Sequence, residues 1–253
     1  MGVEYAQRYY DSLTEAALLS TRAVVPILLE FISPQSVVDV GCGAGGWLAE
    51  FQRRGITDVW GIDGPWVSKS QLQVPVDRFE VADIGEPIRR QRRYDLAICL
   101  EVAEHVGAAA ADTLVDSLTG LSDVILFSAA IPFQGGEHHV NEQWPDYWVE
   151  KFEKRGYVVI DCLRPRIWSN PKVEYWYAQN MFLLVAESHL RTDAGLAAAA
   201  ARTNRQQLSL VHPRAFLEGS VRAKRPAELI QVTLGAIKRA LFSRAPRRIR
   251  REP

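Results

Sequence analysis

The chain has 253 residues, of which 47% are hydrophobic and 24% charged, with 30 basic and 30 acidic side chains. This length predicts one main domain with a sizeable core and an appendage. The three cysteines form no CxxC pair, no apolar run approaches the ~20 residues that span a bilayer, and the polar N-terminus lacks a signal-peptide core, so we expect a cytoplasmic protein without a disulfide framework or zinc ribbon.

Seven short apolar or β-branched runs predict strands, and helical patterns alternate with them. This alternation predicts an α/β, doubly wound, Rossmann-like domain with a mostly parallel seven-stranded sheet and ligands at the carboxyl ends of its strands. The predicted strands are residues 36–40, 58–62, 78–82, 94–100, 123–129, 157–163 and 181–187. The predicted helices are residues 11–31, 47–54, 108–119, 145–155, 194–205 and 227–242.

The pattern predicts three parts: an N-terminal helical segment (1–34), a core (35–188) and a helical C-terminal extension (189–253). Ten of the 30 basic residues but only two of the 30 acidic residues fall at positions 219–253, so a tail of +8 follows a body of −8. The amphipathic basic helix at 227–242 predicts a peripheral contact with an anionic membrane, or a solvated extension. Nucleic acid is a less favoured partner because the body is acidic.

A glycine-rich loop, VVDVGCGAGGW, joins the first strand to the next helix. Gly41, Gly43 and Gly46 satisfy GxGxxG, with Asp63 where a ribose-binding acid would follow, so the glycines alone fit a dinucleotide of an NAD-dependent dehydrogenase as well as S-adenosylmethionine (SAM). Asp39, inside the first strand, favours SAM, because a carboxylate there suits the ammonium group of SAM and opposes a pyrophosphate.

The ordered motifs DVGCGAG, GID, VAD and YDLAICLEVAEH resemble those of class I SAM-dependent methyltransferases over residues 35 to 187. The resemblance implies an antiparallel edge strand near residues 181–187. It also implies that SAM is held by Asp39 and the loop at Gly41, Cys42, Gly43 and Gly45, with Asp63 at the ribose, Asp83 and Ile84 at the adenine, and Glu101 at the border of the SAM site. Capping of helices or turns stays an alternative role for Asp63 and Asp83.

The stretch EVAEH follows the fourth predicted strand. If Glu101 begins a helical turn, Glu104 and His105 lie on one face with it and could bind Mg²⁺ or another divalent cation. The loop after the fifth strand supplies His138 and His139. ExxEH followed by such a histidine resembles metal-dependent O-methyltransferases of small RNA and of ubiquinone synthesis, which implies the metal ligands Glu101, Glu104, His105 and His139.

A catalytic site without metal is the second hypothesis for these residues. There His138 or His139 would act as the general base beside Glu101, because a hydroxyl is a poor nucleophile at neutral pH. Purely structural roles are the third. Under either the metal hypothesis or the general-base hypothesis, we predict that the protein is an O-methyltransferase.

The stretches GGEHHVNEQWPDYWVEKFEKRGY, RPRIWSNPKVEYWYAQN and, later, VHP (211–213) together resemble a bacterial methyltransferase group associated with surface-polysaccharide and other glycan synthesis. The resemblance implies a sugar hydroxyl in a glycan or glycosylated small molecule as acceptor. Aromatic rings there suit stacking on a sugar face. RNA, a catechol-like small molecule and a non-catalytic SAM-binding subunit are the alternatives. The aromatic residues are Trp144, Tyr147, Trp148, Trp168, Tyr175, Trp176 and Tyr177.

Overall fold

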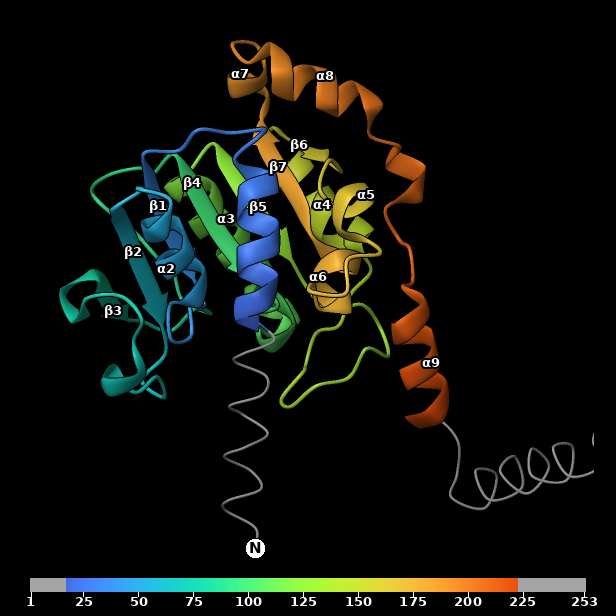
Figure 1. The fold of residues 1–253 in the computed structure, drawn as a ribbon, viewed down its shortest axis with the longest axis horizontal. Coiled ribbons are helices and arrows are strands. Elements are labelled where there is room, and N and C mark those ends of the chain that lie inside the picture. The colour runs from blue at the N-terminus through green and yellow to red at the C-terminus, as the bar shows by residue number, and fades with distance from the viewer. Residues whose placement is uncertain (1–16, 223–253) are drawn as a thin grey trace, which may run out of the picture. The chain divides into compact units, whose positions relative to one another are not determined.

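The computed structural model describes residues 17–222 and contains one seven-stranded sheet in the order β3-β2-β1-β4-β5-β7-β6 (Figure 1). All seven predicted strands are present, which confirms the predicted α/β fold. The strands are β1 (Ser36–Val40), β2 (Asp58–Asp63), β3 (Phe79–Val81), β4 (Leu96–Leu100), β5 (Val124–Ser128), β6 (Tyr157–Ile160) and β7 (Phe182–Ala186).

The sheet is mixed, because β7 runs antiparallel to both of its neighbours, β5 and β6, while β1 to β5 pair in parallel. The antiparallel direction of the last strand agrees with the sequence, but its expected edge position is wrong. All five residues of β7 are buried, as an internal strand requires. The edge is β6, whose Val158 is partly exposed.

Helices cover both faces of the sheet (Figure 1). The helix at residues 17–28 is the described part of the predicted helix 11–31, and the predicted helices at 47–54, 108–119, 145–155 and 194–205 are present within a few residues. The others are α2 (Gly46–Arg53), α3 (Ala111–Leu121), α4 (Pro145–Glu153), α5 (Arg164–Ile167), α6 (Tyr175–Asn180), α7 (Glu187–Leu190), α8 (Ala194–Arg202) and α9 (Pro213–Arg222). Short 3-10 helices are η1 (Lys69–Gln71), η2 (Val76–Arg78), η3 (Ala103–His105), η4 (Ala108–Ala110) and η5 (Arg205–Gln207).

Two apolar clusters lie on opposite faces of the sheet, because successive strand residues such as Val37 and Val38 point to opposite sides. One face packs against the helix at 17–28 and α2, and the other against α3 and α4. The helix residues of the first cluster include Val24, Val25, Leu28, Leu48 and Phe51, and those of the second Leu114, Leu118, Trp148 and Phe152.

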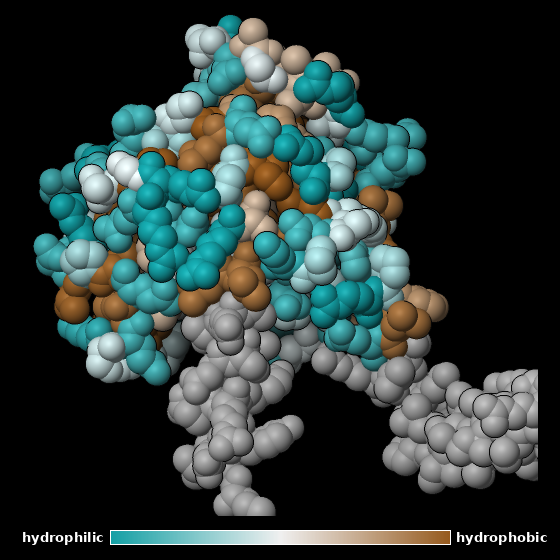
Figure 2. All heavy atoms as spheres, viewed as in Figure 1, coloured by the Kyte–Doolittle hydropathy of each residue, from teal (hydrophilic) through white to brown (hydrophobic). Residues whose placement is uncertain are grey.

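The chain divides into two compact units, Met1–His212 and Pro213–Pro253. Residues 189–212, expected in the tail, belong to the first unit, where Leu196 and Ala199 of α8 are buried in the core. The predicted tail helix at 227–242 and its predicted membrane contact lie outside the described residues. Within residues 17–222 no helix is both long and apolar enough to cross a bilayer, and hydrophilic side chains cover most of the face seen in Figure 2.

Candidate active site

The glycine loop turns sharply between β1 and α2. Gly41 has a φ of +83° and Gly43 one of +52°, a region that side-chain-bearing residues rarely adopt. A Cβ on Gly41 would lie 2.3 Å from a methyl of Val102, whereas one on Gly43 would meet nothing within 4 Å. The first glycine therefore permits close packing inside the protein, and the second keeps a space open next to the loop.

Two predicted acids lie beside this loop in different environments. Asp39 is 2% exposed, and its Oδ2 has no hydrogen-bond partner among the described residues. Burial, and then the charge of Asp63, raises the pKa of Asp39 well above its ordinary value. Asp63 accepts hydrogen bonds from the backbone N–H of Gly43 (2.7 Å) and of Gly64 (2.6 Å). Of these two acids, Asp39 is therefore the one with a carboxylate oxygen that no hydrogen-bond donor of the described residues satisfies.

Asp83 accepts a hydrogen bond from the N–H of Gly85 at 2.8 Å, so it does form the turn that was the alternative to a ligand role. Its carboxylate and the buried Ile84 nevertheless line a cavity. Asp83 can form the turn and contact a ligand at the same time, because one oxygen of its carboxylate stays available after the turn has formed.

A cavity of about 770 Å³ opens at the carboxyl ends of β1, β2 and β4, and a second of about 390 Å³ adjoins it at Gly41 and Gly43. The first is lined by the predicted residues Asp63, Asp83, Ile84, Glu101, His105 and His138, together with Trp66. The second is lined by the predicted Asp39 and Cys42, together with Trp47, Gln73, Trp176 and Tyr177. Gly45 lines neither of these cavities.

Glu101 does not begin a helical turn as predicted. Its φ is +54°, and the 3-10 helix η3 begins only at Ala103. The Glu101 N–H donates to the backbone oxygen (3.0 Å) and the hydroxyl oxygen (3.1 Å) of Ser128, which holds the chain to the end of β5. Its half-buried carboxylate accepts hydrogen bonds from Asn180 (3.1 Å) and Gln134 (2.8 Å), so neutral amides, not charges, orient it.

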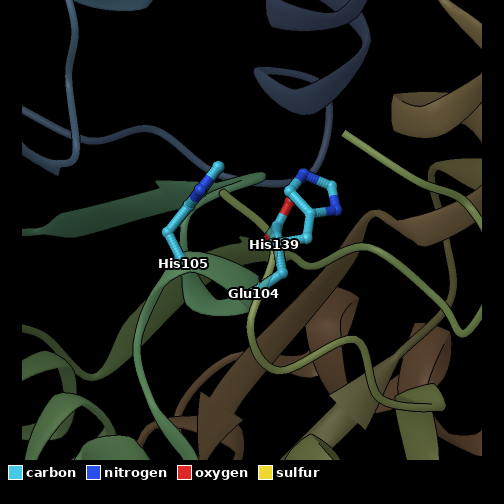
Figure 3. A group of neighbouring side chains, drawn as sticks. All are labelled: Glu104, His105 and His139. Atoms are coloured by element: carbon cyan, nitrogen blue, oxygen red, sulfur yellow. The ribbon is translucent and has the colours of Figure 1, made fainter. Parts of the chain in front are cut away.

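Glu104, His105 and His139 bring one ligand atom each to within 4.8 Å of one another (Figure 3). His139 Nε2 lies 3.9 Å from Glu104 Oε1, and the two imidazole rings are 4.8 Å apart and nearly perpendicular. Glu101, also predicted as a ligand, is not in this group. A carboxylate with two imidazoles is a donor set for a borderline divalent cation.

Glu104 is fully buried, and neither carboxylate oxygen has a hydrogen-bond partner among the described residues. Burial, and then the charge of Glu101, raises the pKa of Glu104 to about 9. Desolvation, and then His139, lowers the pKa of His105. Both shifts have the sign expected of ionisable groups that face each other without a counterion.

The two histidines of the loop face different parts of the site. His138 has a φ of +59°, is exposed and lines the larger cavity, while the half-buried His139 faces Glu104. The left-handed backbone at His138 allows the side chains of His138 and His139 to point toward two adjoining parts of the site. The metal and base hypotheses therefore involve different histidines.

Sequence reasoning missed Gln134, Asn180 and Glu142, which bond to Glu101 or His139. Asn180 offered one signal, because it is a polar residue directly before the apolar run of β7 and is 2% exposed. No local pattern marks Gln134 or Glu142, whose partners depend on the fold of the loop.

Comparison with known proteins gives a consistent family. Residues 4–160 match the family model described as "Methyltransferase domain". A ubiquinone biosynthesis O-methyltransferase of Ralstonia nicotianae is 33% identical over 119 residues, 41% of this chain and 48% of that protein, so the alignment spans about half the relative's length.

Solved structures share the fold at low sequence identity. A magnesium protoporphyrin IX methyltransferase of Synechocystis with bound S-adenosylhomocysteine matches with a TM-score of 0.52 and 17% identity, over 68% of this chain and 84% of that one. A sugar N-methyltransferase of a Streptoalloteichus species matches with a TM-score of 0.53 and 12% identity, over 72% and 92%. At these identities the likeness establishes the fold alone.

Proposed function

The chain belongs to the class I SAM-dependent methyltransferases, and from this premise we propose that it methylates a hydroxyl of a sugar in a glycan or glycosylated small molecule, at a site that uses a divalent cation. The observation that carries the cation is Glu104, a fully buried carboxylate without a hydrogen-bond partner among the described residues, beside two imidazoles. The family assignment replaces the dinucleotide interpretation of the glycine loop.

The residues at the loop fit SAM. Asp39 offers a buried carboxylate oxygen without a donor, which suits the ammonium group of the cofactor, and the space beside Gly43 admits a ligand against the backbone. We assign Asp63 to the ribose hydroxyls, and Asp83 with Ile84 to the adenine. SAM, when bound, supplies an electrophilic methyl group on a sulfonium sulfur.

The residues at the end of β4 fit a divalent cation. Glu104 and the two imidazoles of His105 and His139 would hold it, with Glu101 as the further predicted ligand. When bound, such an ion lowers the pKa of a hydroxyl that contacts it, which answers the weak nucleophilicity of alcohols. Without the ion, Glu104 keeps its proton at neutral pH, since its pKa is about 9.

His138 is the residue we assign as proton acceptor for the acceptor hydroxyl. It lines the larger cavity together with Glu101, and it is not in the group that faces Glu104. An exposed imidazole is a side chain suited to exchange protons with solvent at neutral pH. Glu101, held by two amide donors, borders the reacting region.

The sugar acceptor is supported by the resemblance of residues 135–180 to glycan-associated methyltransferases and by the aromatic side chains Trp66, Trp176 and Tyr177 in the cavity walls. A catechol-like acceptor is the second candidate, because a curated relative is a ubiquinone biosynthesis O-methyltransferase. Both acceptors present vicinal oxygens to a cation.

Methyl transfer from radiolabelled SAM to a panel of sugar glycosides and catechols tests the proposal. We expect transfer to vicinal diols that EDTA abolishes and Mg²⁺ or Mn²⁺ restores, and that Glu104→Ala abolishes in the presence of metal. Glu187→Ala, which alters an exposed carboxylate of α7 that lines neither cavity, is the matched control. Full activity in EDTA refutes the cation, and transfer to catechols alone refutes the sugar.

A further inference from the structure

Glu142 joins three donors of the loop between β5 and α4. It accepts hydrogen bonds from the backbone N–H of Phe133 (2.8 Å) and of Gly135 (2.7 Å), and its Oε1 lies 2.8 Å from Nδ1 of His139. The carboxylate is 19% exposed, which limits competition from water. One side chain thus connects the start of the loop to the histidine that faces Glu104.

The contact with Glu142 decides which nitrogen of His139 carries the proton. A carboxylate that already accepts two backbone N–H groups can only accept from the imidazole as well, so Nδ1 donates. In the neutral ring the lone pair then falls on Nε2, the nitrogen 3.9 Å from Glu104. A metal-ligating histidine commonly donates its other ring N–H to a carboxylate in this way.

The loop holds this geometry against its own backbone preferences. Phe133 has a φ of +70° and His138 one of +59°, which cost free energy in residues with side chains. The ring of His139 also packs on Gly136, where an added Cβ would lie 2.2 Å from Nε2. The backbone N–H groups of Val140 and Asn141 donate to the backbone oxygen of Glu104 and hold the loop beside it, and Glu142 adds the contacts that tie the start of the loop to the ring of His139.

We propose that Glu142 is a positioning residue that fixes His139 in the tautomer with Nδ1 protonated and directs Nε2 toward the cation site. The inference rests on the proposed cation for its functional meaning, whereas the tautomer itself belongs to the metal-free protein. A carboxylate with a purely structural role would alter loop stability and leave the tautomer unchanged.

Two readouts test the proposal on the full chain: the ¹⁵N spectrum of His139 at a pH where histidines are neutral, and calorimetric titration with Mn²⁺. His139→Gln assigns the signal. We expect the Nδ1–H tautomer in the wild type, a mixture of tautomers in Glu142→Ala, and about 10- to 100-fold weaker Mn²⁺ binding in that variant. Glu142→Gln, whose amide oxygen can still accept from Nδ1, should retain the tautomer, and Glu187→Gln, which alters an exposed carboxylate of α7 away from both cavities, should match the wild type in both readouts.

The outcomes separate this proposal from the cation. An Nε2–H tautomer in the wild type, or an unchanged tautomer in Glu142→Ala, overturns the positioning role even if Mn²⁺ binds. Absence of Mn²⁺ binding to the wild type refutes the cation, while the tautomer of His139 still decides whether Glu142 orients it. If Glu142→Ala unfolds, the comparison of Glu142→Gln with Gly136→Ala replaces it, since the added methyl should displace the ring and weaken Mn²⁺ binding although Glu142 is intact.

Discussion

Replacing Glu104 with glutamine should remove much of the pH dependence of stability in the metal-free protein. The pKa of Glu104 rises from 4.5 to about 9 on folding, so between these values the folded state holds a proton that the unfolded state has released. The contribution of Glu104 to the stability of the wild type is therefore highest at low pH, falls as pH rises through this window and levels off above it. The slope from this one carboxyl is ~1.4 kcal/mol per pH unit.

Over a rise from about pH 6 to about pH 8 the wild type should lose ~3 kcal/mol relative to Glu104→Gln. For a domain of this size that loss corresponds to roughly 5–10 °C in melting temperature. The amide of glutamine is also buried, but its cost does not change with pH and alters only the offset between the curves. His105, whose lowered pKa makes its own contribution rise with pH, is present in both proteins, so the difference isolates Glu104.

Thermal unfolding in EDTA, followed by circular dichroism at several pH values, measures this difference. Curves for the wild type and Glu104→Gln that stay parallel from about pH 6 to 8 would show that Glu104 is ionised in the folded protein, and would refute the reasoning. Adding Mn²⁺ should raise the melting temperature of the wild type more at the higher pH, because Glu104 must lose its proton to become a ligand. The variant should not respond.

Four further substitutions test the SAM site and the network around it. Gly43→Ala should weaken SAM binding in calorimetry with little loss of stability beyond ~1 kcal/mol, because its methyl would enter the open space beside the loop, whereas Gly41→Ala should lower the melting temperature strongly. Asp39→Asn should weaken SAM binding without destabilising the protein, because a neutral amide avoids the desolvation that raises the pKa of Asp39; unchanged affinity would contradict its role. Burial raises the pKa of Glu101 and the hydrogen bond from Asn180 opposes that rise, so Asn180→Ala should shift the acid limb of the rate–pH profile to higher pH; an unmoved limb would exclude Glu101 from the reaction.

The strands were predictable because their residues carry a local pattern. In β1 all five residues are buried, and the run of valines predicts this burial. Asp39 is the one charged residue of the strand, and its Oδ2 lacks a hydrogen-bond partner among the described residues. The position of β7 was not predictable in the same way. The position of β7 between β5 and β6 depends on which strands pair with one another, and no short stretch of sequence determines that pairing.

The conformation of Glu101 was likewise not predictable from the local sequence. A helical turn after β4 was reasonable from composition, but the chain first passes through a left-handed residue that is bonded to Ser128 of β5. Its carboxylate is then bound by Asn180, 79 residues later in the chain. Motif order predicted which residues gather at the end of β4, whereas the hydrogen bonds that orient them depend on tertiary contacts.

Asp39 and Glu104 are two buried carboxylates of one site, and each has an oxygen without a partner among the described residues. Leaving such groups unpaired costs stability, so both positions favour ligands that bring positive charge. Their surroundings differ in kind. Asp39 lies beside the backbone of the glycine loop, where an organic ammonium can donate hydrogen bonds. Glu104 faces two imidazoles, which attract a metal ion only when their lone pairs face it. The tautomer of His139 therefore decides whether Nε2 can offer its lone pair to a cation beside Glu104, and Glu142 is the residue that we propose sets it.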